Sequence, residues 1–183
     1  MHKTFCQFAG FSLMLFLATA GGAVEMRLNA LDGTTAKLED YRGNWVVVNY
    51  WATWCPPCIE EMPELQAFHD DNVGKGALVI GINIEYISKQ KLRNFLDDLF
   101  ITYPIFTSPP VEKSELGLIP GLPTTFLVTP DGEVVARQIG PITRDMIELF
   151  IEKWESQKLP TAFIDNKASG LNPVNMRGNH FKT

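Results

Sequence analysis

The two cysteines of one short segment restrict most strongly what this chain can fold into. Cys55 and Cys58 are three residues apart, and the only other cysteine, Cys6, lies in an apolar N-terminal segment. At the start of a helix, positions i and i+3 lie about 5–6 Å apart on one face, a separation that a disulfide tolerates. An apolar run, 45–51, precedes the pair, and helix-forming residues, 59–70, follow it. A CxxC pair between a strand and a helix is typical of a redox site.

Composition and charge exclude several other classes of protein. The chain has 183 residues, of which 45% are hydrophobic and 20% are charged, as expected for one globular domain. Its net charge is −5, and no basic patch is visible in the sequence. A nucleic-acid partner is therefore not expected.

The N-terminus has the pattern of a secretory signal. Lys3 is followed by an apolar run, 8–18, and Ala18-Thr19-Ala20 fits a cleavage site, with Gly21-Gly22-Ala23 as a second candidate. An uncleaved membrane anchor is the alternative. We therefore expect 1–23 to be a signal peptide or anchor, 24–158 a single domain, and 159–183 an irregular or disordered tail. The protein would be exported, either soluble in the periplasm or anchored by its N-terminus.

Hydrophobic periodicity and turn residues predict an α/β domain with a mixed central sheet flanked by helices and an N-terminal β-hairpin extension. Expected strands are a hairpin within 26–38, buried strands 45–51 and 77–84, a short strand 104–106, and a second hairpin of 124–128 and 133–139. Expected helices are 56–72, kinked at Pro63, then 89–100, a single turn near 112–116, and 143–157. The inward stripes of the second and last helices would be Leu92, Phe95, Leu96 and Leu99, and Met146, Ile147, Phe150, Ile151 and Trp154.

Three other functions of the cysteine pair compete with redox exchange. A structural disulfide across two residues would close too small a loop to constrain the unfolded chain much. A copper or zinc carrier would need further ligands; His69 is eleven residues past Cys58, and only Met62 is close. A peroxidase is less favoured, because no threonine stands three residues before a lone attacking cysteine. The sequence predicts redox exchange without metal or cofactor.

The residues around the pair indicate how the exchange would proceed. Cys55 stands at a helix N-terminus, where the dipole favours a thiolate and where we expect the thiol to be exposed. Pro57 removes a backbone donor from that thiolate, and weak thiolate stabilisation favours a reductant over an oxidant. Glu61 lies one helical turn beyond Cys58 and could exchange a proton with it. Alternatively, Glu60, Glu61 and Glu64 form an ordinary solvated face. Glu85, after the second buried strand, is a weaker candidate.

Two separate motifs resemble the thioredoxin superfamily, specifically its TlpA/ResA-like thiol–disulfide oxidoreductases. They are Trp51-Ala52-Thr53-Trp54-Cys55-Pro56-Pro57-Cys58 and Gly121-Leu122-Pro123-Thr124-Thr125-Phe126-Leu127-Val128. The resemblance, which covers about 26–154, implies a thioredoxin fold and an exported or membrane-tethered protein. It also implies reduction of protein disulfides, for example in cytochrome c maturation, with a membrane thiol reductase as electron donor. We expect a monomer.

Individual roles follow from the resemblance by position. Cys55 resembles the attacking cysteine and Cys58 the resolving one, which together form the redox disulfide. Glu61 stands where ResA-like members carry an active-site glutamate, and Pro123 resembles the cis-proline that faces the disulfide. A cis bond would expose the backbone of Leu122 to an extended substrate. Trp54, Pro56 and Pro57 are the other expected substrate contacts. Asn49 departs from thioredoxin, which has a buried acid at that position.

Overall fold

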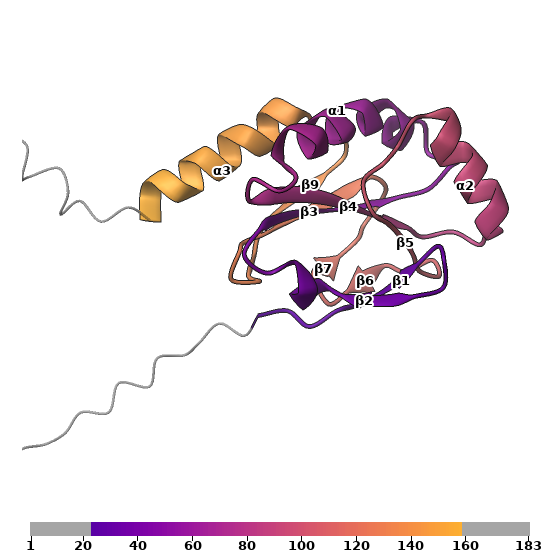
Figure 1. Ribbon diagram of the computed structural model, residues 1–183, viewed down its shortest axis with the longest axis horizontal. Helices are drawn as coiled ribbons and strands as arrows, with labels where there is room; N and C mark the ends of the chain where they lie inside the picture. Colours follow the sequence, from indigo (N-terminus) through magenta and orange to yellow (C-terminus); the bar gives the residue numbers. More distant parts are fainter. Residues whose placement is uncertain (1–22, 159–183) are drawn as a thin grey trace, which may run out of the picture.

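A mixed β-sheet organises the part of the chain that the computed structural model describes, residues 23–158 (Figure 1). The strands are β1 Arg27–Ala30, β2 Thr35–Lys37, β3 Trp45–Trp51, β4 Ala77–Asn83, β5 Ile105–Thr107, β6 Lys113–Ser114, β7 Gly117–Leu118, β8 Thr124–Val128 and β9 Val134–Ile139. The helices are η1 Leu38–Tyr41, a 3-10 helix, α1 Pro56–Asn72, α2 Lys89–Asp98 and α3 Arg144–Lys158. The predicted signal peptide, up to residue 22, and the tail 159–183 lie outside the described residues.

The sheet has seven strands in the order β2-β1-β5-β4-β3-β8-β9. β3, β4 and β5 run parallel to one another, and every other neighbouring pair is antiparallel. All seven residues of β3 and all seven of β4 are buried, which explains their continuous apolar sequences. The N-terminal hairpin β1-β2 joins the main sheet through β5.

All three α-helices lie on one side of the sheet (Figure 1). The two parallel crossovers, β3-α1-β4 and β4-α2-β5, step across the sheet in the same direction, so the right-handed rule places both helices on one face. Residues from α1, α2 and α3 share one hydrophobic cluster with alternate residues of β3, namely Trp45, Val47 and Trp51. Cys55 and Cys58 belong to this helix-side cluster.

The opposite face of the sheet is covered by the N-terminal hairpin, η1 and the segment 108–120. Val46, Val48 and Tyr50 of β3 pack there with Leu38, Leu116 and other apolar residues of these segments. The helical turn predicted near 112–116 is wrong, because Lys113 and Ser114 pair with Leu118 and Gly117 as the two-stranded sheet β6-β7. Gly117 has a φ of +140°, which a right-handed helix does not allow.

Two residues predicted to lie in helical core stripes are instead exposed. α2 ends at Asp98, so Leu99 is its C-terminal cap and remains 37% exposed. On α3 the inward side chain is Ile147, and the neighbouring Met146 is 43% exposed at the edge of that stripe. The remaining predicted stripe residues of α2 and α3 do pack into the helix-side cluster.

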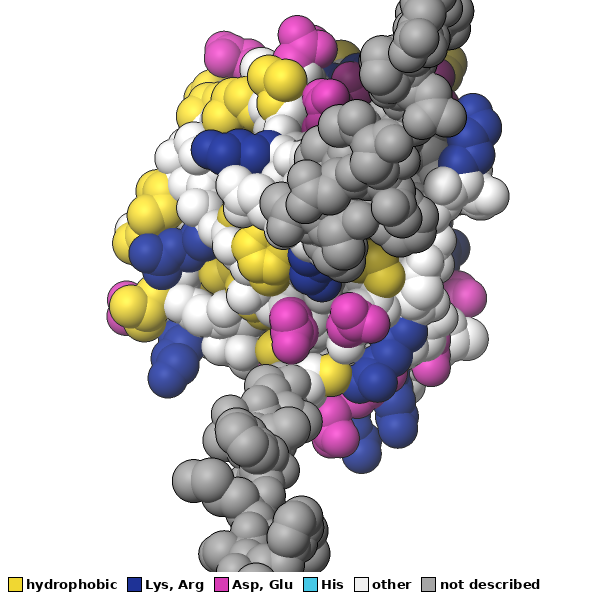
Figure 2. Space-filling view, turned by 90° about the vertical axis from the view of Figure 1, so that its left-hand side faces the viewer, with side chains coloured by type: hydrophobic (Ala, Val, Ile, Leu, Met, Phe, Trp, Pro, Cys, Tyr) yellow, Lys and Arg dark blue, Asp and Glu magenta, His cyan; other side chains and the backbone are white. Residues whose placement is uncertain are grey.

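The surface carries charges of both signs without segregation. On the face that Figure 2 presents, Lys and Arg side chains lie interspersed with acidic and hydrophobic side chains, and several of them lie close together at the lower right beside acidic ones. No helix among the described residues has the length and apolarity that crossing a membrane would require.

Candidate active site

A disulfide joins Cys55 and Cys58 directly after the central strand β3. Cys55 is the N-cap of α1, Cys58 lies in its first turn, and their Cα atoms are 5.3 Å apart. Cys58 is fully buried, and Cys55 is only 3% exposed. The prediction of an exposed Cys55 is therefore wrong for this state, because the disulfide lies within the helix-side cluster, against which Leu122 also packs.

The first turn of α1 offers the Cys55 sulfur few hydrogen-bond donors. Pro56 and Pro57 occupy the first two helical positions and have no N–H group. The next two amides, of Cys58 and Ile59, donate to the Cys55 carbonyl oxygen at 3.1 and 3.2 Å. A thiolate at Cys55 would have the helix dipole but no free amide in this turn.

Glu61 is a buried carboxyl on the same face of α1 as Cys58. Its side chain is 3% exposed, whereas Glu60 and Glu64 are exposed, so the alternative of three solvated glutamates is wrong for Glu61. Glu61 Oε1 accepts a hydrogen bond from Asn49 Nδ2 at 2.6 Å, and Oε2 accepts one from the Ile142 amide at 2.8 Å. β3 and the segment before α3 therefore hold the carboxyl at both oxygens.

The surroundings of Glu61 bring the pKa of its carboxyl close to neutral pH. Burial raises the pKa of Glu61 to about 7, although the hydrogen bonds from Ile142 and Asn49 oppose the rise. At neutral pH this carboxyl is therefore close to half ionised. Cys58 stands three residues earlier, and residues at that helical spacing lie about 5–6 Å apart. At that spacing one bridging water could connect the carboxylate to the thiol of the reduced protein, which general-base transfer permits.

Glu85, the weaker candidate for proton transfer, accepts hydrogen bonds at both carboxyl oxygens. Its Oε1 accepts hydrogen bonds from the Thr53 amide at 2.7 Å and from Asn83 Nδ2 at 2.8 Å, and its Oε2 accepts one from Thr53 Oγ1 at 3.1 Å. These bonds tie the end of β4 to the loop that leads to Cys55. Glu85 thus positions the cysteine loop, a role that no sequence signal indicated.

The second motif lies at the same end of the sheet as the disulfide. The Leu122–Pro123 peptide bond is cis, as the resemblance implied. Thr124, the next residue, opens β8 and pairs with Tyr50 near the end of β3. Both motifs therefore converge at the ends of β3 and β8.

A groove of about 570 Å³ runs beside this site. Its lining includes Trp54, Tyr86, Ile119 and Leu122. Trp54 is 67% exposed, which is unusual for so large an apolar side chain. The other two expected substrate contacts, Pro56 and Pro57, do not line the groove, and Pro56 is exposed on the helix end.

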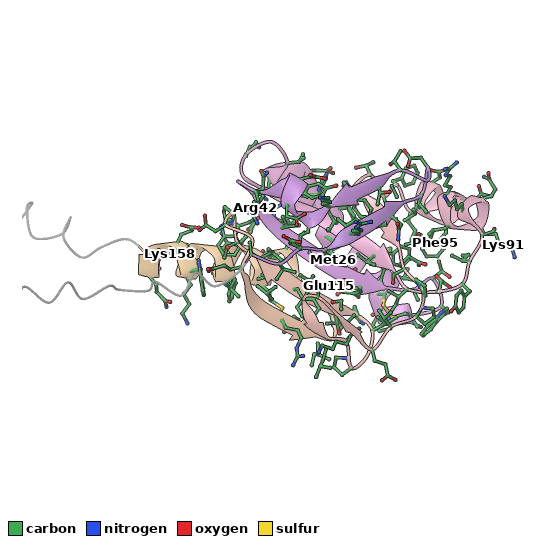
Figure 3. All side chains as sticks on the ribbon, turned by 90° about the horizontal axis from the view of Figure 1, so that it is seen from below. Met26, Arg42, Lys91, Phe95, Glu115 and Lys158 are labelled. Atoms are coloured by element: carbon green, nitrogen blue, oxygen red, sulfur yellow. A yellow bond between two sulfur atoms is a disulfide. The ribbon has the colours of Figure 1, made fainter. Side chains whose placement is uncertain are left out.

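Trp51 belongs to the core, in contrast to Trp54. Its ring is buried and stacks on Phe95 with a centroid distance of 5.8 Å. Figure 3 labels Phe95 on the α2 side of the sheet. Packing explains Trp51, so Trp54 is the tryptophan available to a substrate.

The residues that the structure describes contain no cluster of three or more His, Cys, Asp or Glu side chains able to hold a metal. His69, the histidine considered for a metal site, accepts a hydrogen bond from the Val79 amide through Nδ1 at 3.2 Å. Its side chain is engaged in fixing α1 to β4.

Comparison with known proteins gives consistent results. Residues 21–137 match the AhpC/TSA family. The thiol-disulfide oxidoreductase ResA of Halalkalibacterium halodurans is 32% identical over 137 residues, which are 74% of this chain and 77% of that protein. ResA of Geobacillus kaustophilus is 31% identical over 136 residues, covering 74% and 78% of the two chains.

Solved structures agree with the sequence matches. A DsbF homologue from Corynebacterium diphtheriae is 31% identical, with a TM-score of 0.64 over 72% of this chain and 85% of that one. A secreted thiol-disulfide isomerase from Corynebacterium glutamicum is 27% identical, with a TM-score of 0.63 over 68% and 80% of the two chains. These similarities confirm the predicted thioredoxin fold.

Proposed function

Because the chain belongs to the AhpC/TSA family of the thioredoxin superfamily and is a thiol–disulfide oxidoreductase, we propose that it reduces disulfides of exported proteins. The observation that carries this proposal is a CxxC disulfide with a buried carboxyl one turn along the same helix. The carboxyl of Glu61 titrates near neutral pH, where thiols must gain and lose protons.

The first step is attack on the substrate by the reduced protein. The Cys55 thiolate forms a bond to one sulfur of the substrate disulfide, and the other substrate sulfur leaves as a thiolate that takes up a proton. Cys55 is assigned this step because it stands at the N-terminus of α1, where the dipole favours a thiolate. The product is a mixed disulfide between Cys55 and the substrate.

The second step is resolution by Cys58. Glu61 accepts the thiol proton of Cys58, and the resulting thiolate attacks the Cys55 sulfur. The mixed disulfide breaks, the substrate leaves as its second thiolate and takes up a proton, and the Cys55–Cys58 disulfide forms. The substrate has gained two electrons from the cysteine pair and two protons from the solvent. The protein returns two protons to the solvent, one when the Cys55 thiol ionises and one when Glu61 releases the proton of Cys58. A buried thiol such as Cys58 resists ionisation, so a nearby base is needed.

Weak stabilisation of the Cys55 thiolate supports the reductive direction. Strongly oxidising pairs are those whose reduced form is stabilised. In this chain Pro56 and Pro57 lack N–H groups, and the next two amides are bonded to the Cys55 carbonyl oxygen. The reduced form is therefore stabilised little, and the pair should give up electrons readily.

We propose that the substrate binds in the groove beside the disulfide. Trp54 would offer an apolar face to the substrate, and the backbone at Leu122 would pair with an extended segment, as in strand addition. Pro123, whose peptide bond to Leu122 is cis, would hold that backbone beside the disulfide. Pro56 and Pro57 would contact a substrate at the rim.

The wider setting is proposed from the N-terminal pattern and the family resemblance. A signal peptide within 1–23 would export the domain 24–158, soluble or N-terminally anchored in the periplasm, with 159–183 as a tail. A membrane thiol reductase would return two electrons after each turnover. Apocytochromes c are one candidate substrate, and the protein would act as a monomer.

The redox equilibrium of the cysteine pair tests the direction. The purified protein is equilibrated with glutathione or dithiothreitol buffers of known ratio, and the fraction of free thiol is measured. We expect a reducing potential, near the value of about −270 mV that thioredoxin shows. A potential near −120 mV, the value of a strong oxidant, would contradict the reductase proposal.

A further inference from the structure

Asn49 has a buried side-chain amide in which, in the described part of the structure, the nitrogen is hydrogen-bonded and the oxygen is not. Its Nδ2 donates to Glu61 Oε1 at 2.6 Å and to Thr125 Oγ1 at 3.0 Å, so both amide hydrogens are used. Its Oδ1 is buried and has no hydrogen-bond partner among residues 23–158. An unpaired buried carbonyl destabilises the folded state. The short bond to a carboxylate offsets this cost, because hydrogen bonds to a charged group are roughly twice as strong as neutral ones.

This orientation of the amide suits only the ionised form of Glu61. Oε2 is held as an acceptor by the Ile142 backbone amide, which cannot reverse its polarity. A proton taken up by the carboxyl therefore goes to Oε1, the oxygen that faces Asn49 Nδ2. Two donors would then face each other across 2.6 Å. The neutral carboxyl needs an acceptor at that position.

Rotation of the amide by half a turn supplies that acceptor. Oδ1 would take the place of Nδ2 and accept a hydrogen bond from the protonated Glu61 Oε1. Thr125 Oγ1 now accepts from the amide, and a hydroxyl can equally donate, so it would donate to Oδ1 after the rotation. The two amide hydrogens would turn toward β4.

The side toward β4 also contains an unpaired hydroxyl. Asn49 lies opposite Gly81 of β4, and a Cβ atom at Gly81 would come within 3.1 Å of Tyr103 Cε2. The Tyr103 hydroxyl is buried and has no hydrogen-bond partner within the described part of the chain. A tyrosine hydroxyl can accept from an amide or donate to a carbonyl. Tyr103 does not bond Asn49 Oδ1 in the present orientation, so its hydroxyl is free to accept a hydrogen bond from the rotated amide if the two side chains move together.

We propose that the Asn49 side-chain amide rotates by half a turn each time Glu61 gains or releases its proton, with Thr125 reversing its hydrogen bond. The inference rests on the proposed role of Glu61 as the base for Cys58. Asn49 and Thr125 are positioning residues in this scheme, since neither contacts the substrate. Because both protonation states keep a hydrogen bond at Oε1, Glu61 can cycle between them near neutral pH.

Few other titratable groups surround Glu61. On its own helix these are Cys58, which does not titrate in the disulfide, the exposed Glu64, which accepts a hydrogen bond from the Arg144 amide at 3.1 Å, and His69, two turns away. Beside β5 stands Tyr103, whose pKa is raised by burial and further by Glu61. β3 and β8 present Asn49 and Thr125, which do not titrate.

The rotation can be observed directly in the wild-type protein. Nuclear Overhauser effects between the Asn49 side-chain amide hydrogens and the Thr125 side chain are measured in the oxidised form at pH 5 and pH 9. We expect strong effects at pH 9 that are lost at pH 5, with a midpoint equal to that of Glu61. The same pattern at both pH values would overturn the proposal. Because no substrate is present, this result is independent of whether the protein acts as a reductase.

Two substitutions provide a second measurement. Asn49→Leu removes the amide from both protonation states of Glu61, so the pKa of Glu61 should rise by clearly less than about one pH unit. A rise of about one pH unit or more is expected if a fixed amide bonded the carboxylate alone, because a hydrogen bond to a charged group would then be lost from one state only. Thr129→Val is the matched control. This variant removes a different buried polar group, the Thr129 hydroxyl next to β8, which accepts a hydrogen bond from the Glu133 amide. It should leave the pKa of Glu61 unchanged. A rise of about one pH unit or more in Asn49→Leu would also overturn the proposal, because the amide would then bond only the carboxylate.

Discussion

Cys55→Ser is expected to abolish reduction of protein disulfides, whereas Cys58→Ser should stop the reaction halfway. Without Cys55 the attacking thiolate at the N-cap of α1 is lost, and Cys58 lies inside the first turn of the helix. Without Cys58 the first attack still occurs, but the mixed disulfide is not resolved. Cys58→Ser should therefore accumulate covalent complexes with substrate proteins, which non-reducing gels and mass spectrometry detect.

The assignment of the two cysteines has its own control. The reduced protein is treated with a limiting amount of an alkylating reagent, and the modified peptide is mapped. Cys55 should react first, since it caps the helix. Preferential modification of Cys58, or complexes trapped by Cys55→Ser instead of Cys58→Ser, would reverse the roles.

Glu61→Gln should slow resolution of the mixed disulfide by about 10²-fold or more, the lower end of what general-base catalysis contributes. In the wild type, the resolution rate should rise with pH as Glu61 ionises, with an inflection at about 7. The variant should lack that inflection, because glutamine cannot accept the thiol proton. Single-turnover kinetics from pH 5 to 8 measure both effects. The first attack should change less.

Glu60→Gln is the matched control for this variant. Glu60 is the adjacent residue on α1 and is exposed, so its substitution should leave the rate and its pH dependence unchanged. If Glu61→Gln resolves the mixed disulfide at the wild-type rate across this range, Glu61 is not the base.

The pH dependence of the unfolding free energy gives a second measurement on Glu61→Gln. The folded state binds the Glu61 proton more tightly than the unfolded chain, since the pKa is about 7 rather than 4.5. The stability contributed by this proton is present below pH 4.5 and is lost as pH rises through 7, by about 3 kcal/mol. Unfolding free energies of Glu61→Gln should lack this loss.

Most of the fold could be predicted from local sequence patterns. The β-branched and aromatic run 45–51 and the run 77–84 are long enough to specify buried strands, and both are confirmed. The helix after Cys55 was recognisable because Pro56 and Pro57 suit a first turn. The prediction for 112–116 was wrong because two strands of two residues each, connected by Glu115 and Leu116, leave almost no periodicity to detect.

The candidate site was predictable in its cysteines but not in its hydrogen bonds. Glu61 continues the buried stripe of Cys58, Met62 and Leu65, so helical spacing contained the signal of its burial, although three nearby glutamates obscured it. Its pairing with Asn49 links residues twelve positions apart in different elements. Such contacts depend on tertiary packing, which local patterns do not specify.

Glu61 is expected to titrate near neutral pH because its carboxyl is buried. Its side-chain carboxyl carbon can be followed by NMR in the oxidised protein, labelled with ¹³C-glutamate and assigned by comparison with Glu61→Gln, between pH 4 and 9. The account predicts a midpoint at about 7. A midpoint near 4.5, the ordinary value for a solvated glutamate, would contradict it.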